Sequence, residues 1–355
     1  MRKLFLSILL TSSVFAWAGD VSVSSPDGKL QVSVSDAGGR LYYSATLDGQ
    51  QMLLPSALGM KTSIGDFTRD MSIKNYEVRP KSYDYQMRGT KASAASYQAN
   101  CLLMDIQTKD GMKMGIVFQV SNHDIAFRYT LPRQNVGRKE MKRVRIMSEL
   151  SSFNFPDGTT TFISPQIGPE SGWEQTKPSY EEGYSADAPM DAASQYGHGY
   201  IFPALFHLPS GWALVAETGV GSNYCGSHLS DYQAGMGYTV AYPDKGENNG
   251  FGSDFAAIPL PGETPWRTIT LGTTLNPIVE TTISYDVVEP LYAPSTDYQP
   301  GRYTWSWLIW QDNSINYDDQ VKFIDLAAAM GFEYCLVDNW WDTQIGRDRI
   351  PELSR

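Results

Sequence analysis

Cysteine, histidine and charged side chains are scarce in this sequence, and each scarcity removes a class of protein. Three cysteines and four histidines occur in 355 residues, without CxxC, HxxH or HExxH spacing, so neither a disulfide framework nor a zinc site is supported. Charged residues make up 19% of the chain and leave a net charge of −11, which argues against nucleic acid and anionic membrane surfaces as partners. The GxSxG elbow of serine hydrolases and the phosphate-binding P-loop are also missing.

An apolar run opens the chain. Two basic residues and a short apolar core precede Ala16-Trp17-Ala18, which has the small-x-small pattern of a cleavage site. Residues 1–18 are therefore predicted to be a signal peptide, since the run is too short for a membrane span and Gly19-Asp20 follow at once. No cysteine lies at the cleavage site, so we expect no lipid anchor and a periplasmic or secreted protein.

Short alternating segments separated by turns fill residues 19–290. Apolar side chains occupy every second position in residues 30–34, 41–47 and 125–131, which is the pattern of half-buried strands. Turn pairs such as Asp48-Gly49 recur, and no long segment of helical period intervenes. We expect residues 19–290 to form a large antiparallel β-sandwich.

Residues 291–355 are predicted to be a linker followed by strand, helix and strand. The aromatic run from Tyr303 to Trp310 favours a strand, Asn316 is a candidate N-cap and Gly331 a candidate C-cap of the helix. Phe332 to Val337 is apolar enough for a buried parallel strand. This is the first βαβ unit of a (β/α)8 barrel, and a complete barrel takes about 250 residues. We therefore expect the chain to be the amino-terminal fragment of a larger protein.

Acidic and tryptophan side chains follow these expected strands, where barrels place their active sites. Asp338 and Trp341 come after the second strand, and Trp305 lies on the first. A tryptophan ring stacks on the face of a sugar while a carboxylate accepts hydrogen bonds from its hydroxyls, so these three residues are predicted to bind substrate. The simpler interpretations are core packing for Trp305 and a backbone hydrogen bond from the next loop for Asp338.

Two stretches interrupt the alternation of the sandwich region. Residues 164–184 contain four glutamates, and in residues 212–228 Glu217 ends an apolar strand. Calcium takes several oxygen ligands in flexible geometry, so these glutamates are candidate metal ligands. A solvated acidic loop without a metal is the simpler interpretation of both stretches.

Several motifs, taken in order, resemble glycoside hydrolase family 97. They begin with SSPDGKLQVSV, LYYSATLDGQQMLLPSALGM and SNHDIAFRYTLP, and continue with KPSYEEGY, TPWRTITLG, PGRYTWSWLIW and FEYCLVDNWWD. The resemblance implies an amino-terminal β-sandwich, a catalytic (β/α)8 barrel and a small carboxyl-terminal β domain. It also implies an exported, calcium-dependent, exo-acting enzyme that cleaves terminal α-glucosidic or α-galactosidic bonds of oligosaccharides.

The resemblance assigns one metal ligand and no catalytic residue. The family's sandwich supplies a calcium-binding glutamate from a Tyr-Glu motif, here Tyr180-Glu181, so Glu181 is the expected ligand and Glu182 the neighbouring alternative. The two catalytic carboxylates, whose separation distinguishes inversion from retention, are expected beyond residue 355, and the chain alone is expected to be inactive.

Two other functional classes remain open on the sequence. One is a non-catalytic carbohydrate-binding β-sandwich protein, which would bind sugar through residues 19–290 without any further domain. The other is a sandwich that only scaffolds oligomerisation and binds no sugar.

Overall fold

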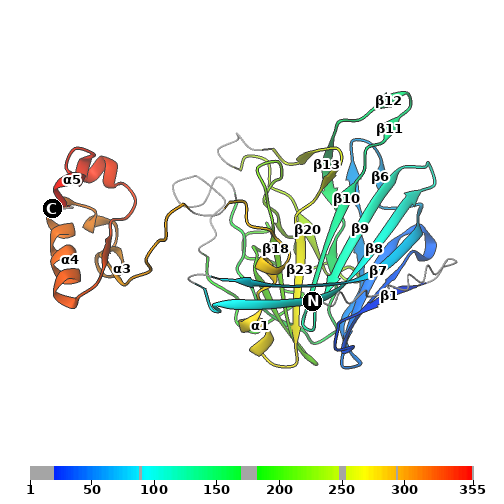
Figure 1. Ribbon diagram of the computed structural model, residues 1–355, viewed down its shortest axis with the longest axis horizontal. Coiled ribbons are helices and arrows are strands. Elements are labelled where there is room, and N and C mark those ends of the chain that lie inside the picture. The colour runs from blue at the N-terminus through cyan, green and yellow to red at the C-terminus, as the bar shows by residue number, and fades with distance from the viewer. Residues whose placement is uncertain (1–19, 88–89, 169–181, 248–252, 293–294, 354–355) are drawn as a thin grey trace, which may run out of the picture. The chain divides into compact units, whose positions relative to one another are not determined.

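The computed structural model describes residues 20–87, 90–168, 182–247, 253–292 and 295–353. The chain separates into two compact units, Met1–Glu289 and Pro290–Arg355 (Figure 1). The predicted signal peptide, residues 1–18, and the expected calcium ligand Glu181 lie outside the described residues. Among the residues that are described, no helix is both long and apolar enough to cross a membrane.

Antiparallel strands build the first unit, and its largest sheet has ten of them. This ten-stranded sheet has the order β16-β15-β17-β18-β23-β10-β9-β8-β7, with β22 beside β10. Its strands are β7 (Met71–Gln86), β8 (Ala94–Thr108), β9 (Lys113–Val120), β10 (Asp124–Leu131), β15 (Thr160–Phe162), β16 (Ala188–Pro189), β17 (Ala204–Leu208), β18 (Gly211–Thr218), β22 (Gly262–Glu263) and β23 (Trp266–Gly272).

Smaller sheets complete the first unit. The first is β1 (Val21–Ser24), β2 (Leu30–Ser35), β3 (Leu41–Leu47) and β4 (Gln50–Leu58). The second, in spatial order, is β21 (Ala256–Pro259), β13 (Arg143–Glu149), β5 (Met60–Thr62) and β6 (Asp66–Phe67). The third is β14 (Ser152–Phe153), β20 (Tyr238–Ala241) and β19 (His228–Leu229), and β11 (Asn135–Val136) pairs with β12 (Lys139–Glu140).

The alternation read from the sequence matches the burial of the strands. Every second residue of β2 and β3 is buried, starting from Leu30 and Leu41. In β10 the apolar residues Ile125, Phe127, Tyr129 and Leu131 are all buried. Two short helices after β23, α1 (Asn276–Glu280) and α2 (Ile283–Asp286), are the helical part of this unit's carboxyl end.

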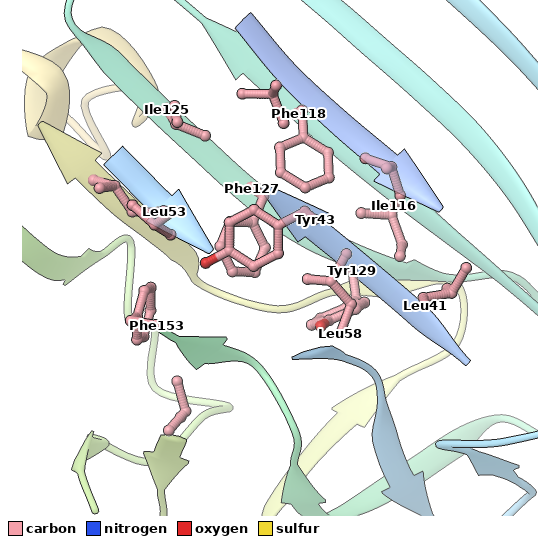
Figure 2. Packing of buried hydrophobic residues seen from close by; sticks show 14 of the residues in the cluster. Leu41, Tyr43, Leu53, Leu58, Ile116, Phe118, Ile125, Phe127, Tyr129 and Phe153 are labelled. Atoms are coloured by element: carbon pink, nitrogen blue, oxygen red, sulfur yellow. The ribbon is translucent and has the colours of Figure 1, made fainter. Parts of the chain in front are cut away.

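The core lies between packed sheet faces. Tyr43 of β3 packs against Phe118 of β9 and Phe127 of β10, with ring centroids 5.8 and 5.2 Å apart (Figure 2). Its hydroxyl donates to the carbonyl of Ser152, so the buried polar atom is satisfied. Such face-to-face packing of antiparallel sheets is the arrangement of a β-sandwich.

The edge of the ten-stranded sheet is a long strand with one neighbour. Strand β7 has 16 residues and pairs with β8 alone. Lys74, Arg79 and Lys81 lie along it, and Pro80 sits in its middle opposite Asn100. Proline has no N–H to donate to a further strand, and charged side chains also discourage edge pairing.

The second unit is a strand, helix and strand with additional helical turns. Strands β24 (Tyr303–Trp305) and β25 (Tyr334–Leu336) pair in parallel, and α4 (Tyr317–Met330) connects them. The remaining helical segments are α3 (Trp307–Trp310), η4 (Asp312–Ser314), η5 (Trp341–Gly346) and α5 (Ile350–Leu353). The parallel βαβ arrangement is confirmed, whereas its place in a barrel stays a prediction. The expected burial of the second strand is wrong, because Tyr334 and Leu336 are exposed.

The caps of α4 agree with the sequence. Asn316 accepts a hydrogen bond from the Asp319 N–H at 3.0 Å, and Gly331 adopts a left-handed conformation with φ of 66°. Among the apolar residues of α4, Phe323 and Ala327 are buried, whereas Leu326 and Met330 are 45% and 57% exposed.

The expected strand from Tyr303 to Trp310 is wrong beyond Trp305. Residues Trp307–Trp310 form the helical turn α3, in which the Ser306 carbonyl accepts from the N–H groups of Ile309 and Trp310. The Ser306 hydroxyl is fully buried and accepts from Gln320 at 2.8 Å. This tertiary contact turns the chain where local composition alone favours an extended strand.

Candidate functional site

Trp305 and Asp338 meet at the carboxyl edge of the two parallel strands. Trp305 is the last residue of β24 and pairs with Leu336, two residues before Asp338. The indole Nε1–H donates to Asp338 Oδ2 at 2.9 Å, and the other carboxylate oxygen accepts from the Asn339 N–H at 2.7 Å. Both side chains are half-buried. The two hydrogen bonds fix the orientation of the indole and of the carboxylate, and the bond from Asn339 is the backbone contact that the simpler interpretation of Asp338 predicted. Binding of substrate by this pair stays a prediction.

A second indole, that of Trp307, belongs to this group. The expected strand would place it on the same face as Trp305, but Trp307 begins the helical turn α3. The Trp307 ring stacks on the Trp305 ring with centroids 5.5 Å apart and planes 21° apart. Its Nε1–H donates to Asp312 Oδ1 at 2.8 Å. The stacking therefore joins the last residue of β24 to the first residue of the helical turn α3, and is not a contact between two residues of one extended strand.

Trp341 lies in a different environment from the other two predicted substrate-binding residues. It is 40% exposed and lines an apolar hollow of about 500 Å³ with side chains of α4, β25 and α5. Cys335 of β25 and Ile350 of α5 are among its neighbours there. Neither Trp305 nor Asp338 lines this hollow, so the three predicted residues do not form one cluster within the described part of the chain.

In the first unit, two sets of hydrogen bonds flank residues 169–181. On the carboxyl side, Ser164 Oγ donates to the Glu182 carbonyl at 2.9 Å, and the Tyr196 hydroxyl donates to the Glu182 carboxylate at 3.0 Å. On the amino side, the Gln166 N–H donates to the Gly199 carbonyl at 2.9 Å. Both flanks are thus fixed to the sandwich by side-chain and backbone contacts.

Ionisable groups gather beside Gln166. Its side-chain amide donates to Glu247 Oε1 at 3.1 Å, and His198 Nδ1 lies 2.6 Å from Asp244 Oδ2. Burial raises the pKa of Glu247 above its ordinary value. Burial also lowers the pKa of His228, more than the opposing attraction of Asp244 raises it. The described residues hold no group of three or more His, Cys, Asp or Glu side chains placed to bind a metal ion.

Glu217, one of the glutamates considered as a metal ligand, instead binds a buried arginine. Arg267 is 1% exposed and its guanidinium donates to Glu149 at 3.0 and 2.7 Å and to Glu217. Burial alone would lower the pKa of Arg267, but Glu149 and Glu217 outweigh it and hold that pKa above its usual value. Glu217 also accepts from Ser227 Oγ at 2.7 Å. Its carboxylate is therefore part of a structural ion-pair network.

Comparison with known proteins places this chain among glycoside hydrolases. The model of the family described as Glycosyl-hydrolase 97 N-terminal matches residues 23–290. A probable retaining alpha-galactosidase of Streptomyces bingchenggensis is 24% identical over 332 residues, covering 93% of this chain and 47% of the relative. A retaining alpha-galactosidase of Bacteroides thetaiotaomicron is 26% identical, covering 100% of this chain and 55% of the relative. The chain thus spans about half the length of the curated relatives it matches.

Solved structures agree with the family match. The crystal structure of a beta-arabinopyranosidase is 52% identical, with a TM-score of 0.88, and the match covers 94% of this chain and 53% of that one. A glycoside hydrolase family 97 enzyme from Pseudoalteromonas sp. strain K8, in complex with panose, is 21% identical with a TM-score of 0.75 over 91% of this chain and 49% of that one. The second likeness shows a shared fold.

Proposed function

Because the chain belongs to glycoside hydrolase family 97, we propose that the full-length protein is an exo-acting, retaining glycosidase of galacto-configured pyranosides. The observation that carries this proposal is the 52% identity to a beta-arabinopyranosidase over 94% of the chain. Two alpha-galactosidases among the relatives support the same sugar configuration. These relatives support a galactoside rather than a glucoside as the proposed substrate.

The two substrate names describe closely related rings. The β-L-arabinopyranosyl group has the configuration of an α-D-galactopyranosyl group at carbons 1 to 4 and lacks the hydroxymethyl group on carbon 5. A site that binds the hydroxyls of one ring can therefore bind the other, and space at carbon 5 decides the preference. We propose terminal β-L-arabinopyranosides as the first substrate class and terminal α-D-galactosides as the second.

Retention requires a carboxylate nucleophile and a carboxylic acid about 5 Å apart, with a covalent glycosyl-enzyme between two displacement steps. None of the described carboxylates is proposed for either role. The contribution of this chain would be recognition of the sugar, through the indole of Trp305 and the carboxylate of Asp338. Their mutual hydrogen bond of 2.9 Å supports that role because it holds both groups in one orientation.

Calcium is the proposed metal, with Glu181 as a ligand. Calcium takes six to eight oxygen ligands, and the described residues contain no cluster that would complete such a site. Glu181 would therefore supply one ligand among several. The neighbouring Glu182 already accepts a hydrogen bond from Tyr196, which favours Glu181 over it. Calcium titration of the full-length protein should weaken in Glu181→Ala and be retained in Glu182→Gln; the reverse result would exchange their roles.

Export is proposed from residues 1–18. The intact mass of the mature native protein should correspond to a chain that begins at Gly19. The cleaved protein should be recovered from the periplasm or the medium. An uncleaved protein retained in the cytoplasm would contradict the proposal.

Substrate choice is tested with the full-length protein and three p-nitrophenyl glycosides. We expect the highest kcat/KM for the β-L-arabinopyranoside, a lower value for the α-D-galactopyranoside and the lowest for the α-D-glucopyranoside. Proton NMR of the first product should show the anomer of the substrate. A preference for the glucoside, or an inverted first product, would contradict the proposal. The 355-residue chain alone should show no turnover, because two parallel strands cannot enclose a barrel site.

A further inference from the structure

A groove of about 560 Å³ crosses the outer face of the ten-stranded sheet. Side chains alternate between the two faces of a strand, and the register aligns the outward ones in rows. One row crosses five strands and consists of Asn75, Asp105, Gly115, Thr130 and Glu263. The next row, two residues along each strand, consists of Glu77, Leu103, Val117 and Arg128. These nine residues are called the sheet-face groove.

The floor of the sheet-face groove consists of apolar side chains and a glycine. Leu103 and Val117 are half-buried neighbours on adjacent strands. Gly115 contributes no side chain between Asp105 and Thr130, and a Cβ there would collide with the Thr130 hydroxyl. Glycine weakens a strand unless something needs the space, so its presence at this position keeps the hollow open.

The rim is polar and partly fixed in place. The Arg128 guanidinium lies over the Trp266 ring at 4.3 Å and pairs with Glu263 at 2.6 Å, which holds its planar donors at one wall. Across the floor, Asp105 accepts from the Asn75 amide at 3.3 Å. In the described part of the chain Asp105 forms no ion pair, so most of its acceptor capacity faces the groove.

We propose that the sheet-face groove binds a neutral saccharide of one or two pyranose rings. The Asp105 carboxylate would accept hydrogen bonds from hydroxyls, and so would the Glu77 carboxylate, whose two oxygens also accept from Arg79. The Arg128 guanidinium would donate to ring or hydroxyl oxygens, and the apolar floor would meet the C–H face of the sugar. A volume of about 560 Å³ lies within the range of small-molecule sites.

Other ligand classes fit the same groove poorly. Among the described residues, no three His, Cys, Asp or Glu side chains are placed close enough together to bind a metal ion. An anion would face Asp105, which has no ion pair among the described residues, beside Glu77 and Glu263, whose charges are offset by Arg79 and Arg128, in a protein of net charge −11. A purely apolar molecule would leave the rim groups desolvated without partners. A polyhydroxylated, uncharged ligand satisfies both the rim and the floor.

The test is a titration of the 355-residue chain with melibiose and with digalacturonate, followed by saturation-transfer difference NMR. Asp105→Ala and Glu77→Ala each remove an exposed groove acceptor without disturbing the core, and Asp84→Ala is the matched control on the same strand β7 but outside the groove. We expect saturable binding of melibiose, no binding of digalacturonate, and about a tenfold loss of affinity in each groove variant. The control should bind as the unsubstituted chain does.

Several results would overturn this proposal. They are the absence of saturable melibiose binding, binding that both groove variants leave unchanged, equal losses in Asp84→Ala, and preferential binding of digalacturonate. The proposal does not rest on hydrolysis by the full-length protein, because the titration needs no turnover. Failure of the p-nitrophenyl assays and failure of groove binding are therefore separate outcomes.

Discussion

Arg267 shows how much one buried charge can matter at the scale of a residue. It holds two carboxylates, Glu149 at 0% and Glu217 at 11% side-chain exposure. Removing the guanidinium leaves both carboxylates without their cation in a site that water hardly reaches. Breaking a buried pair in this way is far more damaging than breaking an exposed one.

Arg267→Ala should lower the free energy of unfolding by about 3–5 kcal/mol, because it leaves uncompensated buried charge. Urea denaturation followed by far-ultraviolet circular dichroism measures the loss. Arg69→Ala is the control, since Arg69 is 70% exposed in its pair with Asp66, and its loss should stay below about 1 kcal/mol. Similar losses in both variants would show that the buried network does not stabilise the fold.

His228 gives a pH dependence with a definite sign. Burial, and secondarily the nearby His198, lower the pKa of His228 below 6.5, against the attraction of Asp244. Between the two pKa values the unfolded chain binds a proton at this side chain and the folded chain does not. The contribution of His228 to stability is therefore fully present above pH 6.5 and is lost as the pH falls toward the folded pKa. We expect His228→Gln to flatten the fall of Tm between pH 7 and pH 5.

The control for this prediction is His123→Gln. His123 is exposed, and its replacement should leave the pH dependence of Tm as it is in the unsubstituted chain. An unchanged slope in His228→Gln would assign the pH dependence to other groups.

Trp305 and Asp338 illustrate what the sequence reveals about single residues. Trp305 and Asp338 were both expected at strand ends, and parallel pairing does bring them to the same edge. Trp307 could not be assigned to this pair, because its stacking depends on the turn at α3. Trp341 was grouped with them by proximity in the sequence, whereas η5 places it against an apolar hollow.

Elements with strong local signals were predictable, and those set by distant contacts were not. The alternation in β2 and β3 predicted which side chains are buried, since one face of each strand must meet the core. In β10 it predicted the buried apolar residues but not the burial of Asp124 and Ala126 on the other face. Asn316 and Gly331 similarly set the ends of α4. By contrast, the sequence did not reveal the end of β24 at Trp305, because the buried Ser306 is held by Gln320, fourteen residues away.

The N-cap of α4 offers a test at the scale of one element. Asn316→Ala should remove the bond to the Asp319 N–H and destabilise the helix by about 1 kcal/mol. Hydrogen exchange of the α4 amides, measured by mass spectrometry on the whole chain, should accelerate about fivefold. Asn313→Ala, an exposed neighbour outside the helix, should leave exchange unchanged, and equal exchange rates in the two variants would count against the cap.

At the scale of the whole molecule, the two units differ in how much apolar surface they bury. The main core of the first unit is drawn entirely from residues between Val21 and Leu271. In the second unit, Leu308 and Ile309 are 64% and 68% exposed. One unit has the core of an independent domain, while the other leaves large apolar side chains in contact with water.

Residues 20–289 produced alone should therefore fold cooperatively, because their core needs no residue of the second unit. Calorimetry should give a single transition, with a Tm within a few degrees of the sandwich transition in the 355-residue chain. Binding of the dye ANS should fall when residues 290–355 are removed, since these carry exposed apolar groups. A broad transition with strong ANS binding would show that the sandwich depends on the second unit.

The proline in the middle of the long edge strand has a consequence for the newly made chain. A sixteen-residue edge is a template on which a second, still unfolded copy could add a strand while the protein is being synthesised at high local concentration. Pro80 interrupts the row of backbone N–H groups at the centre of that template, and the charged side chains of Arg79 and Lys81 on either side of it discourage the pairing of a further strand. The same backbone that shapes the sandwich thus also keeps neighbouring copies from joining into continuous sheets before they are complete.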